Sequence, residues 1–207
     1  MRGFTLIELM ISMAIMLILS GILFARYPET VKRLTLANTT HTVALLIREA
    51  QVRGSAVDSV NSTLGGYGVY ASLTNPTQLI LFGDVVDGTV SRYQIATGDG
   101  LYQSGGSTPE AKTTVRLPTG YTIVKLCTGS GFPFTCSVTT TTLTISFIRP
   151  DPQPNIYVNA SKTTNFSAGC IELRSLLAPL PGHVRSVQIF NSGMIRTQVG
   201  KCDNSAS

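Results

Sequence analysis

Two histidines and several serines are the side chains of this 207-residue sequence that could suggest catalysis or metal binding. His41 and His183 are far apart, and neither has a carboxylate or a cysteine at metal-ligand spacing around it. The serines form no nucleophile elbow, and the glycines between Gly65 and Gly68 precede a predicted strand instead of the helix of a phosphate-binding loop. We therefore expect no enzyme, no metal site and no cofactor, and we expect the histidines to be solvated or structural.

Four cysteines are present, and no two of them form the Cys-x-x-Cys pair that is typical of zinc and redox sites. Their even number fits structural disulfides in a compartment outside the cytoplasm. Three pairings are possible in principle. The hairpin-like connection between Cys127 and Cys136 favours a local bridge there, which would leave Cys170 to pair with Cys202.

Glu8 is the single charged residue in an apolar stretch from Phe4 to Ala25. A lone carboxylate inside an apolar helix costs a few kcal/mol unless a positive charge pairs with it. No residue from Gly3 to Ala25 supplies that charge. A partner must come from elsewhere, and a newly exposed α-amino group of a neighbouring, identically packed chain is one candidate.

The stretch from Phe4 to Ala25 has 22 residues without proline, and as a helix it spans about 33 Å. That length matches the hydrocarbon core of a bilayer, which is about 30 Å thick. A secretory signal peptide is the alternative, but it has a shorter apolar core followed by a small-residue cleavage site, which Phe24-Ala25-Arg26 is not. The stretch therefore predicts a transmembrane anchor.

The residues Arg2-Gly3-Phe4-Thr5-Leu6-Ile7-Glu8-Leu9 resemble the class III leader and the first helix of type IV pilins and type II secretion pseudopilins. The resemblance covers about 25 residues, and its motif is highly specific. It implies that a prepilin peptidase cuts after Gly3 and that Phe4 becomes the N-methylated N-terminus. It also implies that Glu8 pairs with the Phe4 amine of an adjacent subunit during assembly, because opposite charges in a low-dielectric setting attract strongly.

The resemblance implies an orientation and a set of partners as well. Arg26, Lys32 and Arg33 follow the apolar stretch, so the distribution of basic residues does not favour a cytoplasmic N-terminus. The leader and the cysteines favour it, since the leader is cut on the cytoplasmic side and disulfides form outside the cytoplasm. The implied partners are other pilin or pseudopilin subunits, the prepilin peptidase and the inner-membrane assembly platform.

The helical pattern continues beyond the apolar stretch to Gly54. The buried face is predicted to carry Val43, Leu46, Ile47 and Ala50, which recur at helical spacing, and Pro28 is expected to kink the helix. After Ser55 the period changes to two, which predicts a mostly antiparallel β body. The expected strands are 68–72, 78–85, 89–96, 113–117, 121–127, 140–148, 170–176, 184–191 and 194–199, with hairpin turns at Asp87-Gly88 and at Asn191-Ser192-Gly193.

The body also resembles the H-type minor pseudopilins and related minor pilins. The three landmarks of that group are matched in order by residues 66–70, 145–150 and 187–193. Some of these minor pilins take up DNA through arginines that follow the last hairpin glycine. Here Gly193 is followed by Met194 and Ile195, and Arg196 is the sole arginine nearby, which argues against that role.

Charge gives a further argument against a nucleic-acid partner. Residues 26–53 carry five basic and two acidic side chains, whereas residues 54–207 carry ten and eight. A nearly neutral body makes a poor footprint for a polyanion. The basic residues close to the apolar stretch are expected at a membrane interface or inside a filament.

The sequence therefore predicts a pilin-like α+β fold with four regions: a leader at 1–3, a transmembrane half-helix at 4–25, an amphipathic half-helix at 26–54 and a β-rich body at 55–207. The expected function is that of a structural subunit, minor in abundance, of a type IV pilus or a type II secretion pseudopilus. The alternative is a minor pilin that binds DNA for uptake or contacts a secreted cargo. The precursor is expected to cross the inner or plasma membrane once, with its body outside the cytoplasm, and then to join a periplasmic or cell-surface filament.

Overall fold

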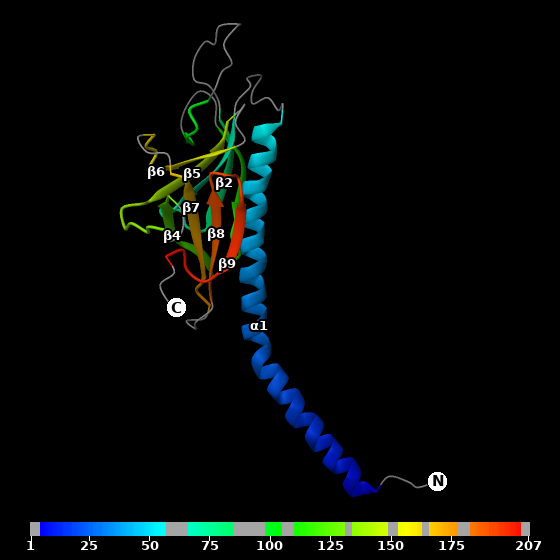
Figure 1. Ribbon diagram of the computed structural model, residues 1–207. Coiled ribbons are helices and arrows are strands. Elements are labelled where there is room, and N and C mark those ends of the chain that lie inside the picture. Colours follow the sequence, from blue (N-terminus) through cyan, green and yellow to red (C-terminus); the bar gives the residue numbers. More distant parts are fainter. Residues whose placement is uncertain are drawn as a thin grey trace.

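A long helix followed by a β-rich body forms the computed structural model (Figure 1). It describes residues 5–56, 66–84, 98–104, 110–130, 134–148, 153–162, 166–177 and 183–203. The helix, α1, runs from Leu6 to Ser55. Its upper half lies against the body and its lower half projects away from it (Figure 1).

One face of α1 is buried, and only in the upper half. The fully buried side chains include Leu36, Val43, Ile47 and Ala50, which follow the three-to-four-residue spacing of one helix face. Thr40 lies on the same face, and its hydroxyl donates to the Leu36 carbonyl oxygen at 2.7 Å, so this polar group is buried with a partner. The predicted face of Val43, Leu46, Ile47 and Ala50 is confirmed.

Proline does not interrupt α1. Pro28 lies inside the helix, which continues without a break over 50 residues, or about 75 Å. The helix axis changes direction below the body (Figure 1), as expected where a proline removes a backbone donor from the helix.

The body consists of two antiparallel sheets. The first has the strand order β3-β2-β1-β5-β6, with β1 at Tyr67–Ser72, β2 at Gln78–Gly83, β3 at Ala111–Arg116, β5 at Thr142–Phe147 and β6 at Pro154–Val158. The second has the order β4-β7-β8-β9, with β4 at Tyr121–Gly129, β7 at Ala168–Ser175, β8 at Val184–Phe190 and β9 at Ile195–Val199.

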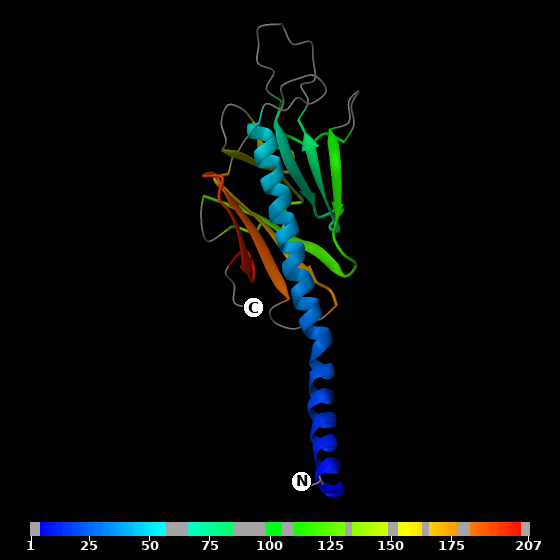
Figure 2. The same ribbon diagram turned by 90° about the vertical axis from the view of Figure 1, so that its right-hand side faces the viewer.

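The helix holds the two sheets together. Figure 2 shows α1 lying across both sheets, with teal and green strands on one side and orange and red strands on the other. A single apolar core joins side chains of α1, such as Ile47, to Ile145 of the first sheet and Ile171 of the second. The body therefore cannot form its complete core without the upper half of the helix.

Two glycines, one close to the C-terminus of α1 and one just before β1, allow both segments to approach the backbone of Phe147 closely. A Cβ on Gly54 would lie 2.6 Å from the Phe147 carbonyl oxygen, and a Cβ on Gly66 would lie 2.7 Å from the same atom. Both distances are too short for real carbon atoms, so only glycine fits at either position. Phe147 itself is buried in the core.

Most of the predicted strands are present, with bounds that differ by a few residues. The turn at Asn191-Ser192-Gly193 is confirmed, because Gly193 has φ +78° and its N–H donates to the Phe190 carbonyl oxygen at 2.8 Å. The prediction was wrong in omitting β6, which begins at Pro154. Proline lacks a backbone donor, but β6 is an edge strand and tolerates it there. The predicted strand 89–96 and the turn at Asp87-Gly88 lie outside the described residues.

Candidate functional site

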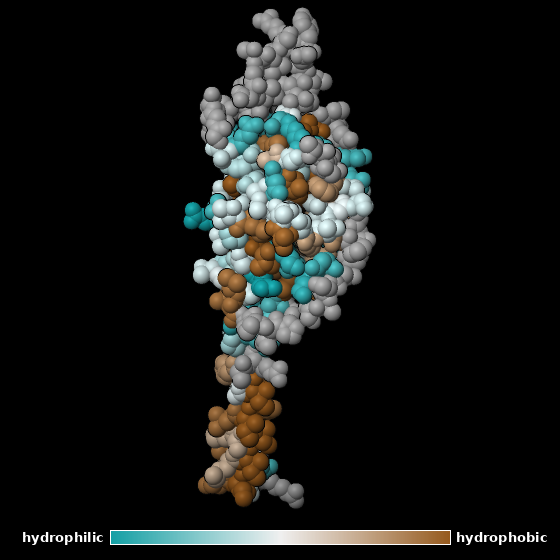
Figure 3. Space-filling model, turned by 90° about the vertical axis from the view of Figure 1, so that its left-hand side faces the viewer, coloured by the Kyte–Doolittle hydropathy of each residue, from teal (hydrophilic) through white to brown (hydrophobic). Residues whose placement is uncertain are grey.

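The lower half of α1 is an exposed apolar surface. Within the part of the chain that the structure describes, α1 is the one helix that is long and apolar enough to cross a membrane. None of its most apolar 18-residue window is buried. Figure 3 shows the lower stalk almost entirely brown, in contrast to the mixed surface of the body. An exposed apolar surface of this size is typical of a segment that contacts a membrane or other proteins.

Glu8 lies in the first turn of this apolar half. Its backbone N–H donates to the Thr5 carbonyl oxygen at 3.1 Å, and its side chain is exposed. Among the described residues, no cation is within salt-bridge distance of its carboxylate. Gly3 and Phe4 lie outside the described residues, so cleavage, methylation and pairing with Glu8 stay predictions.

The base of the body is hydrogen-bonded to α1 at Lys32. The Tyr121 hydroxyl donates to the Lys32 carbonyl oxygen at 3.1 Å, and the Lys32 ammonium donates to the Leu177 carbonyl oxygen at 3.2 Å. Lys32 and Leu177 are 145 positions apart in the sequence. Sequence reasoning missed this junction because no local pattern indicates such a contact.

The four cysteines form two disulfides, Cys127–Cys136 and Cys170–Cys202. Cys127 and Cys170 are direct partners across β4 and β7, so the two disulfides lie side by side. They belong to a small apolar cluster with Phe134 that is separate from the main core. Because Cys170 and the core residue Ile171 are neighbours in a strand, they face opposite sides of the sheet.

The C-terminal segment crosses this outer face of the second sheet. The Cys202 N–H donates to Glu172 Oε2 at 3.3 Å, and the Lys125 ammonium lies 3.1 Å from Asp203 Oδ2. Glu172 is completely buried, although its other oxygen, Oε1, has no hydrogen-bond partner. The second disulfide therefore holds a polar segment over a buried carboxylate.

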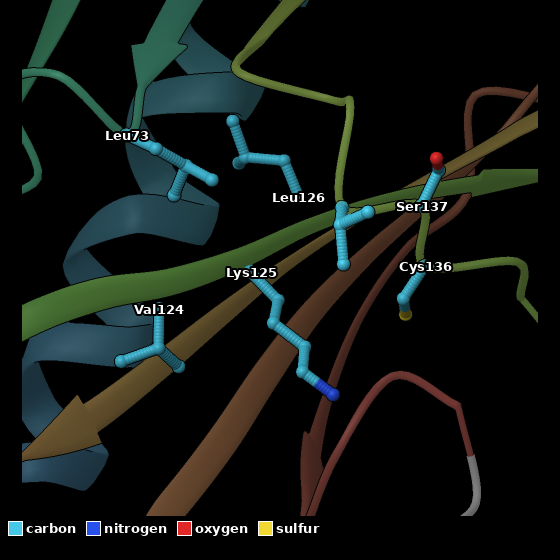
Figure 4. A pocket seen from close by; sticks show the side chains of 7 residues that line it. Leu73, Val124, Lys125, Leu126, Cys136 and Ser137 are labelled. Atoms are coloured by element: carbon cyan, nitrogen blue, oxygen red, sulfur yellow. The ribbon is translucent and has the colours of Figure 1, made fainter.

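A shallow cavity of about 280 Å³ lies next to the Cys127–Cys136 bridge. It is lined by Leu73, Val124, Lys125, Leu126, Cys136, Ser137 and Val138. Figure 4 shows Lys125 extending away from Leu73, and its ammonium already pairs with Asp203. Lys125 is the one charged residue of this lining, and Cys136 is held in a disulfide.

Asp84 is a buried acid that sequence reasoning did not single out. Its side chain is completely buried, and its oxygens accept the N–H groups of Asp99 at 3.0 Å and Gly100 at 2.8 Å. A Cβ on Gly98 would overlap this carboxyl group. Burial raises the pKa of Asp84 to about 7, and the negative charges of Asp99 and Glu110 add to the rise, while the two N–H donors oppose it.

The raised pKa of Asp84 predicts that the body loses stability as the pH rises. The folded state binds this proton more tightly than the unfolded state, in which the pKa is near 3.8. The stabilisation is therefore complete below the unfolded pKa and is lost as the pH rises through about 7. We expect the melting temperature of the body to fall between about pH 4 and pH 7 and to level off above that range. The variant Asp84→Asn should show a flatter pH profile in thermal denaturation followed by circular dichroism. An unchanged slope in Asp84→Asn would assign the pH dependence to another group.

Metal binding finds no support in the described part of the chain, which contains no group of three or more His, Cys, Asp or Glu side chains that could hold an ion. His183 is buried and His41 is exposed on α1, in separate elements. The structure does not bring the two histidines together.

Comparison with known proteins gives one match. Residues 1–24 match the family model described as the prokaryotic N-terminal methylation motif. No curated protein and no solved structure matches the chain. The matched segment contains Gly3, Phe4 and Glu8, and it includes the exposed apolar start of α1. The chain therefore carries the prepilin-type leader shared by type IV pilins and pseudopilins, joined to a pilin-like α+β fold.

Proposed function

We propose that this protein is a minor structural subunit of a type IV pilus or a type II secretion pseudopilus. A prepilin peptidase cuts the precursor after Gly3, and the processed chain assembles through α1. The observation that carries the proposal is the methylation motif at residues 1–24, which includes the exposed apolar start of α1 and the one carboxylate of that segment, Glu8.

Membrane anchoring explains the lower half of α1 before assembly. The apolar side chains from Leu6 to Phe24 are exposed, and 19 residues of helix span about 28 Å. In a bilayer these side chains contact lipid, and in a filament they contact the same segments of neighbouring subunits. The transfer exchanges one apolar environment for another, so the hydrophobic effect does not favour either state strongly.

Charge pairing then favours the filament. Cleavage after Gly3 creates a positive amine on Phe4, and Glu8 carries the one negative charge of the segment. In a packed bundle of apolar helices either charge alone is costly to bury, whereas the pair offsets much of that cost. Pairing of Glu8 with the Phe4 amine of an adjacent subunit therefore favours one fixed axial offset between neighbouring helices.

The upper half of α1 offers a second surface for neighbouring subunits. Leu34, Leu45 and Val52 lie on the side of the helix opposite the buried face, and each is more than half exposed. Apolar side chains on this outward face suit packing against another subunit of the same filament.

The orientation follows from the same scheme. The N-terminus stays cytoplasmic and the body lies outside the cytoplasm, where the two disulfides are stable. The inner-membrane assembly platform then draws subunits from the membrane into the filament. Minor status rests on the resemblance of residues 66–70, 145–150 and 187–193 to the H-type landmarks.

Cleavage between Gly3 and Phe4 provides the direct test. After coexpression with a prepilin peptidase, the intact mass of the protein from membranes should lack Met1 to Gly3 and should gain one methyl group. Gly3→Leu should abolish the cut, because a bulky side chain at this position blocks the peptidase. Gly21→Leu is the matched control, since a Cβ at Gly21 meets nothing within 4 Å, and it should be cut normally. Retention of all three residues, or loss of about 25 as by signal peptidase, would contradict the proposal.

A further inference from the structure

The base of the body presents two exposed leucines at a fixed place beside the stalk. Leu176 and Leu177 follow directly after β7 and are 66% and 49% exposed. We call Leu176 and Leu177 together the basal segment. It belongs to neither sheet and lies outside the main apolar core.

Several contacts hold the basal segment in place. The Leu176 N–H donates to the Gly120 carbonyl oxygen at 2.7 Å, and the Leu177 carbonyl oxygen accepts from the Lys32 ammonium at 3.2 Å. Gly120 has φ +86°, and a Cβ there would lie 2.5 Å from the Leu177 side chain. The Leu177 side chain therefore occupies space that only a glycine leaves open. The two leucines are therefore exposed on a segment whose backbone is held in place by hydrogen bonds.

The helix sets the distance of this segment from the membrane. The apolar run ends at Phe24, and Tyr27, 66% exposed, follows it as an aromatic residue typical of an interface. The Cα of Lys32 lies about 12 Å beyond the Cα of Phe24 along the helix axis. Because long side chains on a helix point back toward its N-terminus by about one turn, the Lys32 ammonium lies about 7 Å from the hydrocarbon edge. The headgroup layer is about 5 to 7 Å thick, so the ammonium and the Leu177 carbonyl meet its outer surface.

We propose that the basal segment docks on the outer surface of the membrane that anchors α1, with Leu176 and Leu177 entering the headgroup region. Lys32 holds the segment at that level and lies where anionic headgroups attract its charge. Residues 26–33 carry three basic side chains and one acidic, which suits an anionic lipid surface. Of these, Arg33 already pairs with Glu29 on the helix. The inference rests on the proposed membrane anchoring of α1.

Docking fixes the orientation of the body of the membrane-bound subunit relative to the bilayer. The body is fixed to the bilayer at two places, the helix and the basal segment, instead of swinging about the bend in α1. Entry into a filament lifts the basal segment off the lipid. The two leucines then become available to contact a neighbouring subunit.

Tryptophan placed at position 176 tests the docking directly, because the native sequence contains no tryptophan. The full-length Leu176→Trp variant is reconstituted in vesicles of phosphatidylcholine and phosphatidylglycerol, with bromines near the headgroup end of the acyl chains. We expect the emission to be blue-shifted and strongly quenched by the brominated lipid. Leu45→Trp is the matched control, because Leu45 is 68% exposed but lies about 31 Å beyond Phe24, and it should not be quenched. Lys32→Met in the Leu176→Trp background should reduce the quenching toward that of the control.

A third variant, Leu19→Trp, separates this inference from the proposed anchoring. Leu19 lies within the apolar half of α1 and should be quenched by bromines near the acyl-chain centre. If tryptophan is quenched at position 19 but no more at 176 than at 45, the docking is wrong and the anchoring stands. If it is not quenched at position 19, the membrane anchoring fails, and the inference fails with it. If the fluorophore of Leu176→Trp is protected in filaments but not quenched in vesicles, the surface contacts a neighbouring subunit and the docking is wrong.

Discussion

Glu8→Leu should leave the subunit in the membrane and exclude it from filaments. In the bilayer, removal of a carboxylate from an apolar helix leaves insertion intact or improves it, since the charge costs free energy there. In the filament, the mutation leaves the Phe4 amine of the adjacent subunit without a partner among apolar helices, which is costly to bury. The measurement is the amount of processed protein in sheared filaments and in membranes, for wild type and variant.

Two further variants show whether charge is the cause of the exclusion. Glu8→Gln keeps the shape of the side chain but removes its charge, so it should behave like Glu8→Leu. Ser12→Leu adds an apolar side chain one turn along the same exposed helix, and it should enter filaments normally. Equal incorporation of wild type and Glu8→Leu would show that the charge pair does not govern assembly.

Removal of the Cys170–Cys202 disulfide should destabilise the body by about 4 kcal/mol. The bridge closes a loop of 32 residues, and loop-closure entropy of the unfolded chain gives this magnitude. Both sulfur atoms belong to completely buried residues, and Cys202 also brings its N–H to the buried Glu172 carboxylate. The double variant Cys170→Ala/Cys202→Ala should therefore shift urea denaturation of the detergent-solubilised protein to lower concentration, with peptide mapping under non-reducing conditions to establish the pairing in the wild type.

The other bridge is the matched control for this prediction. Cys127–Cys136 spans nine positions, so its removal should cost about 3 kcal/mol in the same model. Removal of Cys127–Cys136 also leaves the C-terminal segment attached to β7 through Cys170–Cys202. A larger loss of stability in Cys127→Ala/Cys136→Ala than in the first double variant would contradict the loop-closure argument, and four free thiols in the wild type would remove the basis for both predictions.

The features that the sequence predicted well depend on local pattern. The apolar run, the helical spacing of Val43, Leu46, Ile47 and Ala50, and the turn at Gly193 each follow from neighbouring residues. Gly3, Phe4 and Glu8 belong to one short motif, which the match at residues 1–24 also contains. Local information is sufficient for elements of this kind.

The features that the sequence did not predict depend on contacts between distant segments. β6 begins with a proline and was omitted, because its edge position is known only once the sheet order is known. The burial of Asp84 depends on residues 98–100, which contact it just after the end of β2. The contact of Lys32 with Leu177 requires the base of the second sheet to meet the stalk. None of these leaves a periodic signal in the sequence.

The packing of α1 across both sheets determines how a filament of such subunits would bear tension. A pull along the stalk enters the body through side chains spread along the helix, from Leu36 to Ala50, and through the Lys32 contact at the base. The contacts between α1 and the body are therefore loaded in shear, and many of them must break together before the helix separates from the body. The two disulfides lie on the opposite face of the second sheet, outside the line of force between stalk and body. Reduction of these bonds would weaken the fold of the body without uncoupling it from the helix.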